Sequence, residues 1–348
     1  MDEKELKQKM DETMLAMAKN PQEAKNYHEL ARLYAIQGKY DNVVSIYESL
    51  LSIHHDDTQA LINLGSVCFY HKDYARAVNC YENALMYESD NYIIYFNLGN
   101  VYAELKNFTK ALHNYNKALD LYSENPEVYN AIALLFHDFE DYVESASYYE
   151  KALAIDPDNV NAHVDLGNVC FKLNDYENAL KHYDKVFELK PEKNIAISIG
   201  NTLTAIKKKE DAYNYFDKAI AIPGDNYKAY VCKAIAHSEF KDYDLAIEML
   251  KKAIELNPKK TNAYVLIGNI LANLGKVEES QTYYNMALRM NNSDAKLHML
   301  IGNSYYMQGK IIDALVSYRV AIKLEPDNDE YKLVYIQVLD DYIDKKES

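Results

Sequence analysis

The feature that most constrains this chain is a pattern of apolar and small residues that recurs about every 34 residues. An apolar residue precedes Gly at five related places, whose successive spacings are 34, 68, 101 and 34 residues: Leu64-Gly65, Leu98-Gly99, Leu166-Gly167, Ile267-Gly268 and Ile301-Gly302. A fixed interval of this length is typical of repeat architectures, in which each repeat is one supersecondary unit. The interval divides the chain into nine repeats: 24–57, 58–91, 92–125, 126–159, 160–192, 193–226, 227–260, 261–294 and 295–328. We therefore expect one array over 24–328, with no room for a separate catalytic domain.

Each repeat has the pattern of two amphipathic helices. In the third repeat, Tyr95, Leu98 and Tyr102 fall on one face of a predicted helix. A polar turn follows, and Ala111 and Tyr115 then begin a second apolar stripe. The pattern predicts nine helix-turn-helix hairpins.

Two positions of the repeat carry most of the steric information. The eighth is Gly or Ala in all nine repeats, and the twenty-fourth is aromatic in eight. The distance between packed helices depends on the side chains at their contact, so each ring is predicted to pack on the small residue opposite. The small residues are Ala31, Gly65, Gly99, Ala133, Gly167, Gly200, Ala234, Gly268 and Gly302. The rings are Tyr47, Tyr81, Tyr115, Tyr149, Tyr183, Phe216, Tyr284 and Tyr318. In the seventh repeat, Lys233 stands where the others have Leu or Ile, so either its stem packs with the charge in water or the packing loosens.

Both ends of the array resemble caps. Residues 1–23 are predicted to form an N-terminal half-repeat or capping helix with an apolar stripe of Leu6, Met10, Met14 and Met17. Residues 329–348 are predicted to form a C-terminal capping helix whose inward stripe is Tyr331, Tyr335, Val338, Leu339 and Tyr342. A repeat array needs terminal elements that are apolar inward and polar outward.

Composition favours an all-α protein and excludes several classes of function. Ten Gly and seven Pro in 348 residues are too few for the many tight turns of an all-β fold. No stretch approaches the roughly 20 apolar residues that span a bilayer, and the start lacks a secretory signal, so we expect a cytoplasmic protein without membrane contact. The four cysteines form no C-x-x-C pair and are predicted to be reduced structural thiols. A net charge of −15 disfavours nucleic-acid binding.

These residues resemble the tetratricopeptide repeat family, whose pattern has a large residue, Leu-Gly, Tyr, Ala, an aromatic residue and Pro at the same offsets. The resemblance covers 24–328, although Tyr or His often stands where the family has Trp. It implies an all-α, right-handed α-solenoid of about nine hairpins with terminal capping helices. It also implies that positions 2, 6, 9 and 13 of each first helix line a concave groove for extended peptides or partner helices.

Those groove positions are rich in asparagine, which offers a hydrogen-bond donor and an acceptor to a peptide backbone. Eleven of the 36 hold it: Asn63, Asn97, Asn100, Asn161, Asn168, Asn194, Asn201, Asn262, Asn269, Asn273 and Asn303. The alternative is that these asparagines are solvated or bond within their own helix. The pattern is similar to the asparagine ladder in the helical arm of O-GlcNAc transferases, whose catalytic half is absent here.

Charges at the groove positions nearly cancel. Lys172 is one of five basic residues there, and six residues are acidic. Four of the acidic residues favour a basic ligand segment in repeats three to five: Glu104, Glu127, Asp138 and Asp165. Leu266, Leu300 and Met307 offer apolar anchors toward the end of the array. Position five holds no Lys in any repeat, which disfavours the carboxylate clamp of the chaperone-tail subfamily.

The sequence shows no nucleophile–base set, phosphate loop or metal-ligand spacing, so we predict no catalytic, cofactor or metal site and no enzyme activity. The leading hypothesis is a protein-protein interaction scaffold that binds an extended peptide or partner helix of another protein in the groove. The alternative is an accessory subunit that recruits substrates for a separately encoded enzyme such as a glycosyltransferase. Self-association stays open, because the ends of a repeat array can stack.

Overall fold

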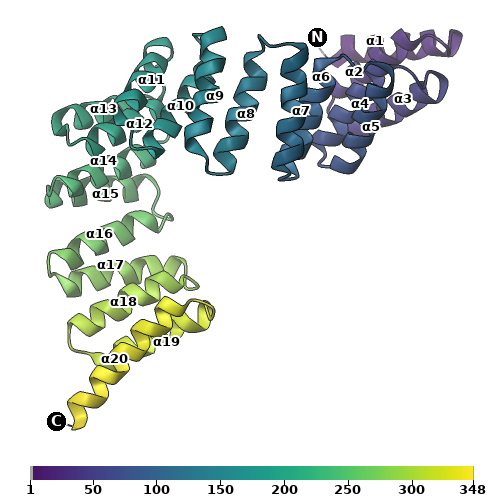
Figure 1. Cartoon of the computed structure of the whole chain (residues 1–348). Helices are drawn as coiled ribbons and strands as arrows, with labels where there is room; N and C mark the ends of the chain where they lie inside the picture. Colours follow the sequence, from purple (N-terminus) through teal and green to yellow (C-terminus); the bar gives the residue numbers. More distant parts are fainter. Residues whose placement is uncertain (1–2, 348) are drawn as a thin grey trace. The chain divides into compact units, whose positions relative to one another are not determined.

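The computed structural model describes residues 3–347, and within this range the chain forms α-helices and no strands (Figure 1). The helices are α1 (Glu3–Lys19), α2 (Ala24–Ile36), α3 (Tyr40–Ile53), α4 (Thr58–Tyr70), α5 (Tyr74–Tyr87), α6 (Tyr92–Glu104), α7 (Phe108–Leu121), α8 (Pro126–Asp138), α9 (Tyr142–Ile155), α10 (Val160–Lys172), α11 (Tyr176–Leu189), α12 (Lys193–Ala205), α13 (Lys209–Ala221), α14 (Tyr227–Glu239), α15 (Tyr243–Leu256), α16 (Asn262–Asn273), α17 (Val277–Met290), α18 (Ala295–Met307), α19 (Ile311–Leu324) and α20 (Asp329–Glu347). The predicted fold class, an α-solenoid of helical hairpins, is confirmed.

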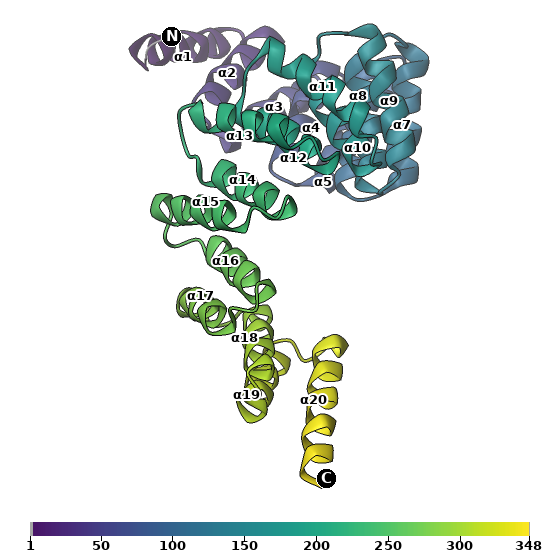
Figure 2. The ribbon, with the colours of Figure 1, turned by 90° about the vertical axis from the view of Figure 1, so that its left-hand side faces the viewer.

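The chain forms two compact units, the first ending at Leu173 and the second beginning at Asn174. Inside each unit, consecutive helices pack as hairpins and the hairpins stack in chain order, as Figures 1 and 2 show for α14–α19 in the second unit. The fifth repeat contributes α10 to the first unit and α11 to the second. The assignment of 1–23, 24–328 and 329–348 as separate segments stays a prediction.

Contacts between rings and glycines hold the hairpins together. Phe216 is fully buried against Gly200, where an added methyl group would lie 2.8 Å from the ring carbon Cε1. A methyl group on Gly65 would lie 2.7 Å from Cε1 of the buried Tyr81. Both distances are far below a normal carbon–carbon contact of about 3.5–4.0 Å. The predicted packing of position 24 on position eight is therefore confirmed in these hairpins.

The turn inside each hairpin places the fifteenth residue of the repeat in the left-handed region. Gly occupies it in three repeats, at Gly38, Gly275 and Gly309. A residue with a side chain occupies it in six: Lys72, Lys106, Glu140, Asn174, Lys207 and Lys241. Left-handed backbone is unfavourable for a residue with Cβ, so hairpin packing compensates for this strain in the five of these turns that lie inside one unit.

The seventh repeat keeps its packing around the unusual lysine. The Lys233 side chain is only 13% exposed, and its Nζ lies 2.6 Å from Asp217 Oδ1 of α13. The stem is thus buried while the ammonium group reaches an exposed carboxylate. The structure therefore shows the first of the two outcomes expected from the sequence, in which the stem packs and the charge stays at the surface.

Both end helices differ in part from the expected caps. In α1, Leu6 and Met10 are buried, but Met14 is 40% exposed, so its predicted place on the inward stripe is wrong. In α20, Tyr331, Tyr335 and Val338 pack in one apolar cluster with residues of α18 and α19. Its outward face is not polar as predicted, because Leu333 and Ile336 are exposed. The packed helix α19 covers one side of α20, and no described helix covers these two side chains.

Candidate peptide-binding groove

The predicted groove residues lie on the first helices of the hairpins, and none of the eleven asparagines is buried. In the first unit they are Asn63 on α4, Asn97 and Asn100 on α6, and Asn161 and Asn168 on α10. In the second unit they are Asn194 and Asn201 on α12, Asn262, Asn269 and Asn273 on α16, and Asn303 on α18. Helix geometry explains the exposure, since positions 2, 6, 9 and 13 face away from the stripe that packs in the hairpin.

Two neighbouring hollows in the second unit bring several of these residues together. One, of about 200 Å³, lies between α14 and α16, and the other, of about 400 Å³, lies between α16 and α18. Both are lined by Asn269 and Asn273, so they lie side by side at these two residues. We call them the asparagine groove, with the lining residues Ile235, Glu239, Leu266, Asn269, Asn273, Tyr284, Leu300, Asn303 and Met307.

The asparagine groove combines amide groups with apolar surface and little charge. The predicted anchors Leu266, Leu300 and Met307 line it, and Met307 is 58% exposed. Its charged lining residue, Glu239, lies 3.4 Å from Lys207 Nζ in an exposed ion pair. A surface of this kind suits a neutral, extended ligand with apolar side chains better than a strongly charged one.

Buried tyrosine hydroxyls bind the asparagines at position nine. Tyr284 donates to Asn269 Oδ1 at 2.8 Å, and Tyr318 donates to Asn303 Oδ1 at 2.8 Å. Burial raises the pKa of both tyrosines to about 12, so both hydroxyls stay protonated near neutral pH. The carboxamides in the groove are therefore attached to the hairpin core beneath them. The sequence analysis did not foresee this bond, although the constant spacing of 15 residues was a usable signal.

The same bond occurs in the first unit, where Tyr115 donates to Asn100 Oδ1 at 2.9 Å. In the second repeat, Ser66 takes the place of the asparagine and lies 3.1 Å from the Tyr81 hydroxyl. In the sixth repeat the ring is Phe216, and Asn201 hydrogen-bonds to the Cys232 thiol instead.

Two other predicted site residues are bound by the ring of the preceding repeat. Asn63 donates to the Tyr47 hydroxyl at 3.0 Å, and its Oδ1 accepts from Gln59 at 3.0 Å. Tyr149 hydrogen-bonds to Asp165, whose carboxyl pKa is raised by burial. Both polar ends of Asn63 already have partners, so it contributes less to a binding surface than expected.

The acidic residues predicted to favour a basic ligand are partly neutralised. Asp138 Oδ2 lies 2.9 Å from Lys106 Nζ, and Glu104 accepts a hydrogen bond from the Tyr74 hydroxyl at 3.4 Å. Lys172 is exposed at the end of α10. Of these acidic residues, Asp138 is thus balanced by a cation, while Glu104 keeps its negative charge.

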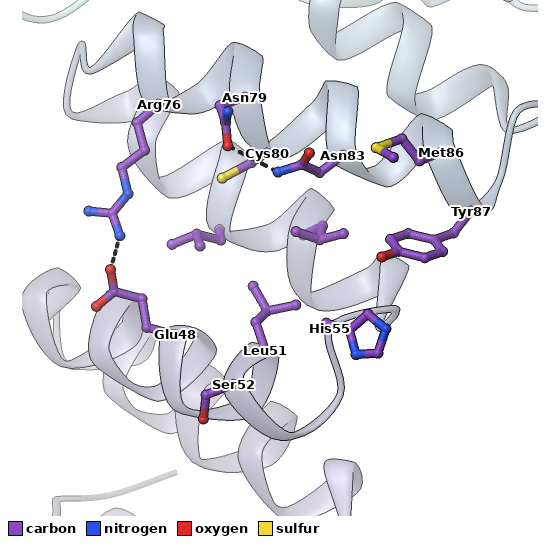
Figure 3. Close-up of a pocket in the computed structure, with 12 residues that line it drawn as sticks. Glu48, Leu51, Ser52, His55, Arg76, Asn79, Cys80, Asn83, Met86 and Tyr87 are labelled. Carbon is purple, nitrogen blue, oxygen red and sulfur yellow. Dashed lines mark hydrogen bonds and ion pairs between the residues drawn. The ribbon is translucent and has the colours of Figure 1, made fainter.

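Two further cavities lie in the first unit. A cavity of about 540 Å³ between α2 and α4 is lined by Arg32, Tyr40, Tyr47 and Asn63, among others. Like the hollows of the asparagine groove, it lies between the first helices of two successive repeats. The other, of about 650 Å³, lies among α3, α4 and α5 and was not foreseen (Figure 3).

In this second cavity, Arg76 pairs with Glu48 across one side, and Asn83 donates to Asn79 along α5. The buried Cys80 is part of its lining (Figure 3). Two asparagines four residues apart on a second helix were the available signal, but the groove positions that the resemblance implies lie on first helices.

Two searches of the described residues bear on other functions. They hold no cluster of three or more His, Cys, Asp or Glu side chains able to bind a metal ion. Within 3–347, every helix is too short or too polar to cross a lipid bilayer.

Sequence models of one family match most of the repeats. Models described as tetratricopeptide repeat match residues 27–61, 90–158, and 137–198 together with 237–303, and a model described as TPR repeat matches 65–106. The matches fall in both compact units.

Curated relatives resemble short parts of the chain. Small glutamine-rich tetratricopeptide repeat-containing protein 2 of Saccharomyces cerevisiae is 34% identical over 89 residues, which is 26% of this chain and 26% of that protein. The mitochondrial import receptor subunit TOM70 of Homo sapiens is 34% identical over 74 residues, covering 21% of this chain and 12% of that protein. The matched segments therefore span about a quarter or less of these relatives.

Among solved structures, a tetratricopeptide repeat protein from Parabacteroides merdae superposes with a TM-score of 0.55. The match has 18% sequence identity and covers 71% of this chain and 98% of that one. At this identity the likeness concerns the fold alone.

Proposed function

Because the chain is a tetratricopeptide repeat protein, we propose that it is a non-catalytic scaffold that binds an extended peptide of another protein in the asparagine groove. The observation that carries the proposal is the adjacency of the two hollows, which share Asn269 and Asn273, while the second also includes Asn303. The lining also includes the apolar side chains of Leu266, Leu300 and Met307.

An extended peptide fits this surface better than a partner helix. The backbone groups of a helix are already paired with one another, so asparagine amides would find few partners on it. An extended peptide leaves its N–H and C=O groups unpaired, and each amide can bond to one without reading the side chain. The apolar anchors Leu266, Leu300 and Met307 would then take its side chains.

The relatives support a protein partner, since one is by name a subunit of an import receptor. The similarity of the asparagine pattern to the arm of O-GlcNAc transferases supports backbone recognition. The proposal does not extend to a carboxylate clamp, because position five of every repeat lacks Lys.

The experiment is a selection of random dodecapeptides on the full chain, followed by affinity measurements with two matched triple variants. Asn269→Ala/Asn273→Ala/Asn303→Ala removes the groove amides. Asn116→Ala/Asn214→Ala/Asn285→Ala removes three exposed amides from second helices and serves as the control.

A hydrogen bond contributes about 0.5–1.5 kcal/mol, so losing three should weaken binding at least about tenfold. The control variant should keep wild-type affinity. Circular dichroism at the assay temperature must show that both variants are folded. Equal peptide affinity of the groove variant and the wild type would place the binding site elsewhere.

A further inference from the structure

The hydrogen bonds beneath the asparagine groove determine which end of each carboxamide faces the ligand. Asn269 and Asn303 line the same hollow, and each accepts a bond from a buried tyrosine through Oδ1. Among the described residues, the Nδ2 groups of both asparagines have no hydrogen-bond partner. The exposed end of each amide is therefore its donor end.

The reverse orientation is disfavoured by the tyrosine and not by the asparagine. If a carboxamide flipped, Nδ2 would face the hydroxyl and the phenol proton would lose its acceptor. In the part of the chain that the structure describes, neither Tyr284 nor Tyr318 has a second acceptor, and both are buried. A buried donor left unpaired disfavours a conformation by roughly tenfold to a hundredfold.

Repeats with and without this arrangement differ at positions eight and nine. Where it is Gly, the ring lies against the helix backbone, and the hydroxyl reaches the next residue of the same helix, as at Gly268 and Gly302. Where it is Ala, at Ala31 and Ala133, the hydroxyl bonds instead to position six of the following repeat. The residues that follow Ala31 and Ala133 are Arg32 and Leu134, whose side chains cannot accept a hydrogen bond, so the bond to position nine goes with glycine at position eight and an acceptor at position nine.

We propose that the hydroxyls of Tyr284 and Tyr318 are positioning groups that turn the amide donors of Asn269 and Asn303 toward the ligand, so that the groove selects peptide carbonyl oxygens. The lining contains no cationic side chain, so neutral backbone carbonyls suit it better than carboxylates. This inference rests on the proposed function for its ligand, but the positioning itself is measurable without one.

The test compares Tyr284→Phe/Tyr318→Phe with Tyr81→Phe in the full chain. Tyr81 is an equally buried ring whose hydroxyl meets Ser66, so the control loses a hydroxyl without touching a groove asparagine. The first readout is the ¹⁵N NMR relaxation of the Asn269 and Asn303 side-chain amides. We expect these amides to be as ordered as the helix backbone in the wild type and in Tyr81→Phe, and mobile in the double variant.

The second readout is the affinity of a dodecapeptide selected on the wild type. Ordering a polar side chain on binding costs about twofold to tenfold in affinity, so the double variant should bind at least about fivefold more weakly. Tyr81→Phe should bind unchanged. Asn amides that stay ordered in the double variant would overturn the proposal, as would mobile amides with unchanged affinity.

A gain-of-function variant covers the case in which the double variant unfolds. The ring beneath Asn201 is Phe216, which has no hydroxyl, and Phe216→Tyr adds one there. Its side-chain amide should become more ordered, and an unchanged amide would contradict the proposal. If no peptide is selected on the wild type, the proposed function fails, while the amide measurements still decide the positioning.

Discussion

Replacing Gly268 by Ala tests the reasoning that closely packed rings hold each hairpin together. An added methyl group would lie 2.6 Å from Tyr284 Cδ1 and 2.9 Å from Cζ, whereas a normal contact is about 3.5–4.0 Å. The ring would have to withdraw by about 1 Å. Tyr284 is 2% exposed and its hydroxyl is bound to Asn269, so little free space is available for that movement.

Three effects set the expected magnitude. Overpacking costs about 1–3 kcal/mol, and weakening the bond between Tyr284 and Asn269 costs about 0.5–1.5 kcal/mol. The higher helix propensity of Ala offsets about 1 kcal/mol of this. We therefore expect Gly268→Ala to lower the free energy of unfolding by about 2 kcal/mol, measured by urea denaturation followed by circular dichroism.

A double-mutant cycle separates steric conflict from other causes. The seventh repeat pairs Ala234 with Leu250 at the equivalent positions, and both are buried. In a Tyr284→Leu background, Gly268→Ala should therefore be neutral or stabilising, because the smaller side chain leaves room for the methyl group. A loss of about 2 kcal/mol that is the same in both backgrounds would refute the steric explanation.

Three further predictions concern stability. Burial raises the folded-state pKa of Tyr284 and Tyr318 from 10.0 to about 12, so the unfolded chain loses these two protons at a lower pH than the folded chain does. The stability that the two protonated hydroxyls contribute is therefore complete below pH 10 and is lost as the pH rises to about 12. Urea titrations from pH 9 to 12 should show a shallower loss in Tyr284→Phe/Tyr318→Phe than in the wild type. Lys233→Ala should destabilise the chain by about 2 kcal/mol through three lost buried methylenes, while Lys233→Met, which keeps the stem, should stay within about 1 kcal/mol, since an ion pair with the exposed Asp217 contributes little. A destabilised Lys233→Met protein would show that the charge pair matters more than the stem. Gly309 has φ +72° and open space around it, so Gly309→Ala should cost about 1 kcal/mol in thermal unfolding through backbone strain alone; no loss would mean that the turn relaxes to another conformation.

Local pattern was enough to predict the helical hairpins of this protein. The interval of 34 residues, the small residue at position eight and the ring at position 24 are short-range features of the chain. Each hairpin buries its stripe mainly against itself and its neighbours, so periodicity alone predicts which side chains form the core. Even the unusual Lys233 could be interpreted in this way, because its length and flexibility allow the charge to reach water.

Exposure at the ends of the array depended on tertiary structure. Met14, Leu333 and Ile336 all carry the residue type of a core position, and all are exposed. A helical stripe indicates which face is apolar, but only the placement of the neighbouring helix decides how much of that face is covered.

The candidate site was predicted in outline, and its detail required the structure. That asparagines occupy one exposed face follows from the angle of about 100° between successive helical residues. Which of them are free does not follow, because Asn63 is bound by the ring of the preceding repeat while Asn269 is bound by the ring of its own. The residue types leave both partners possible, because each tyrosine hydroxyl can donate or accept a hydrogen bond. Only the tertiary placement of the neighbouring helices decides which asparagine that hydroxyl meets.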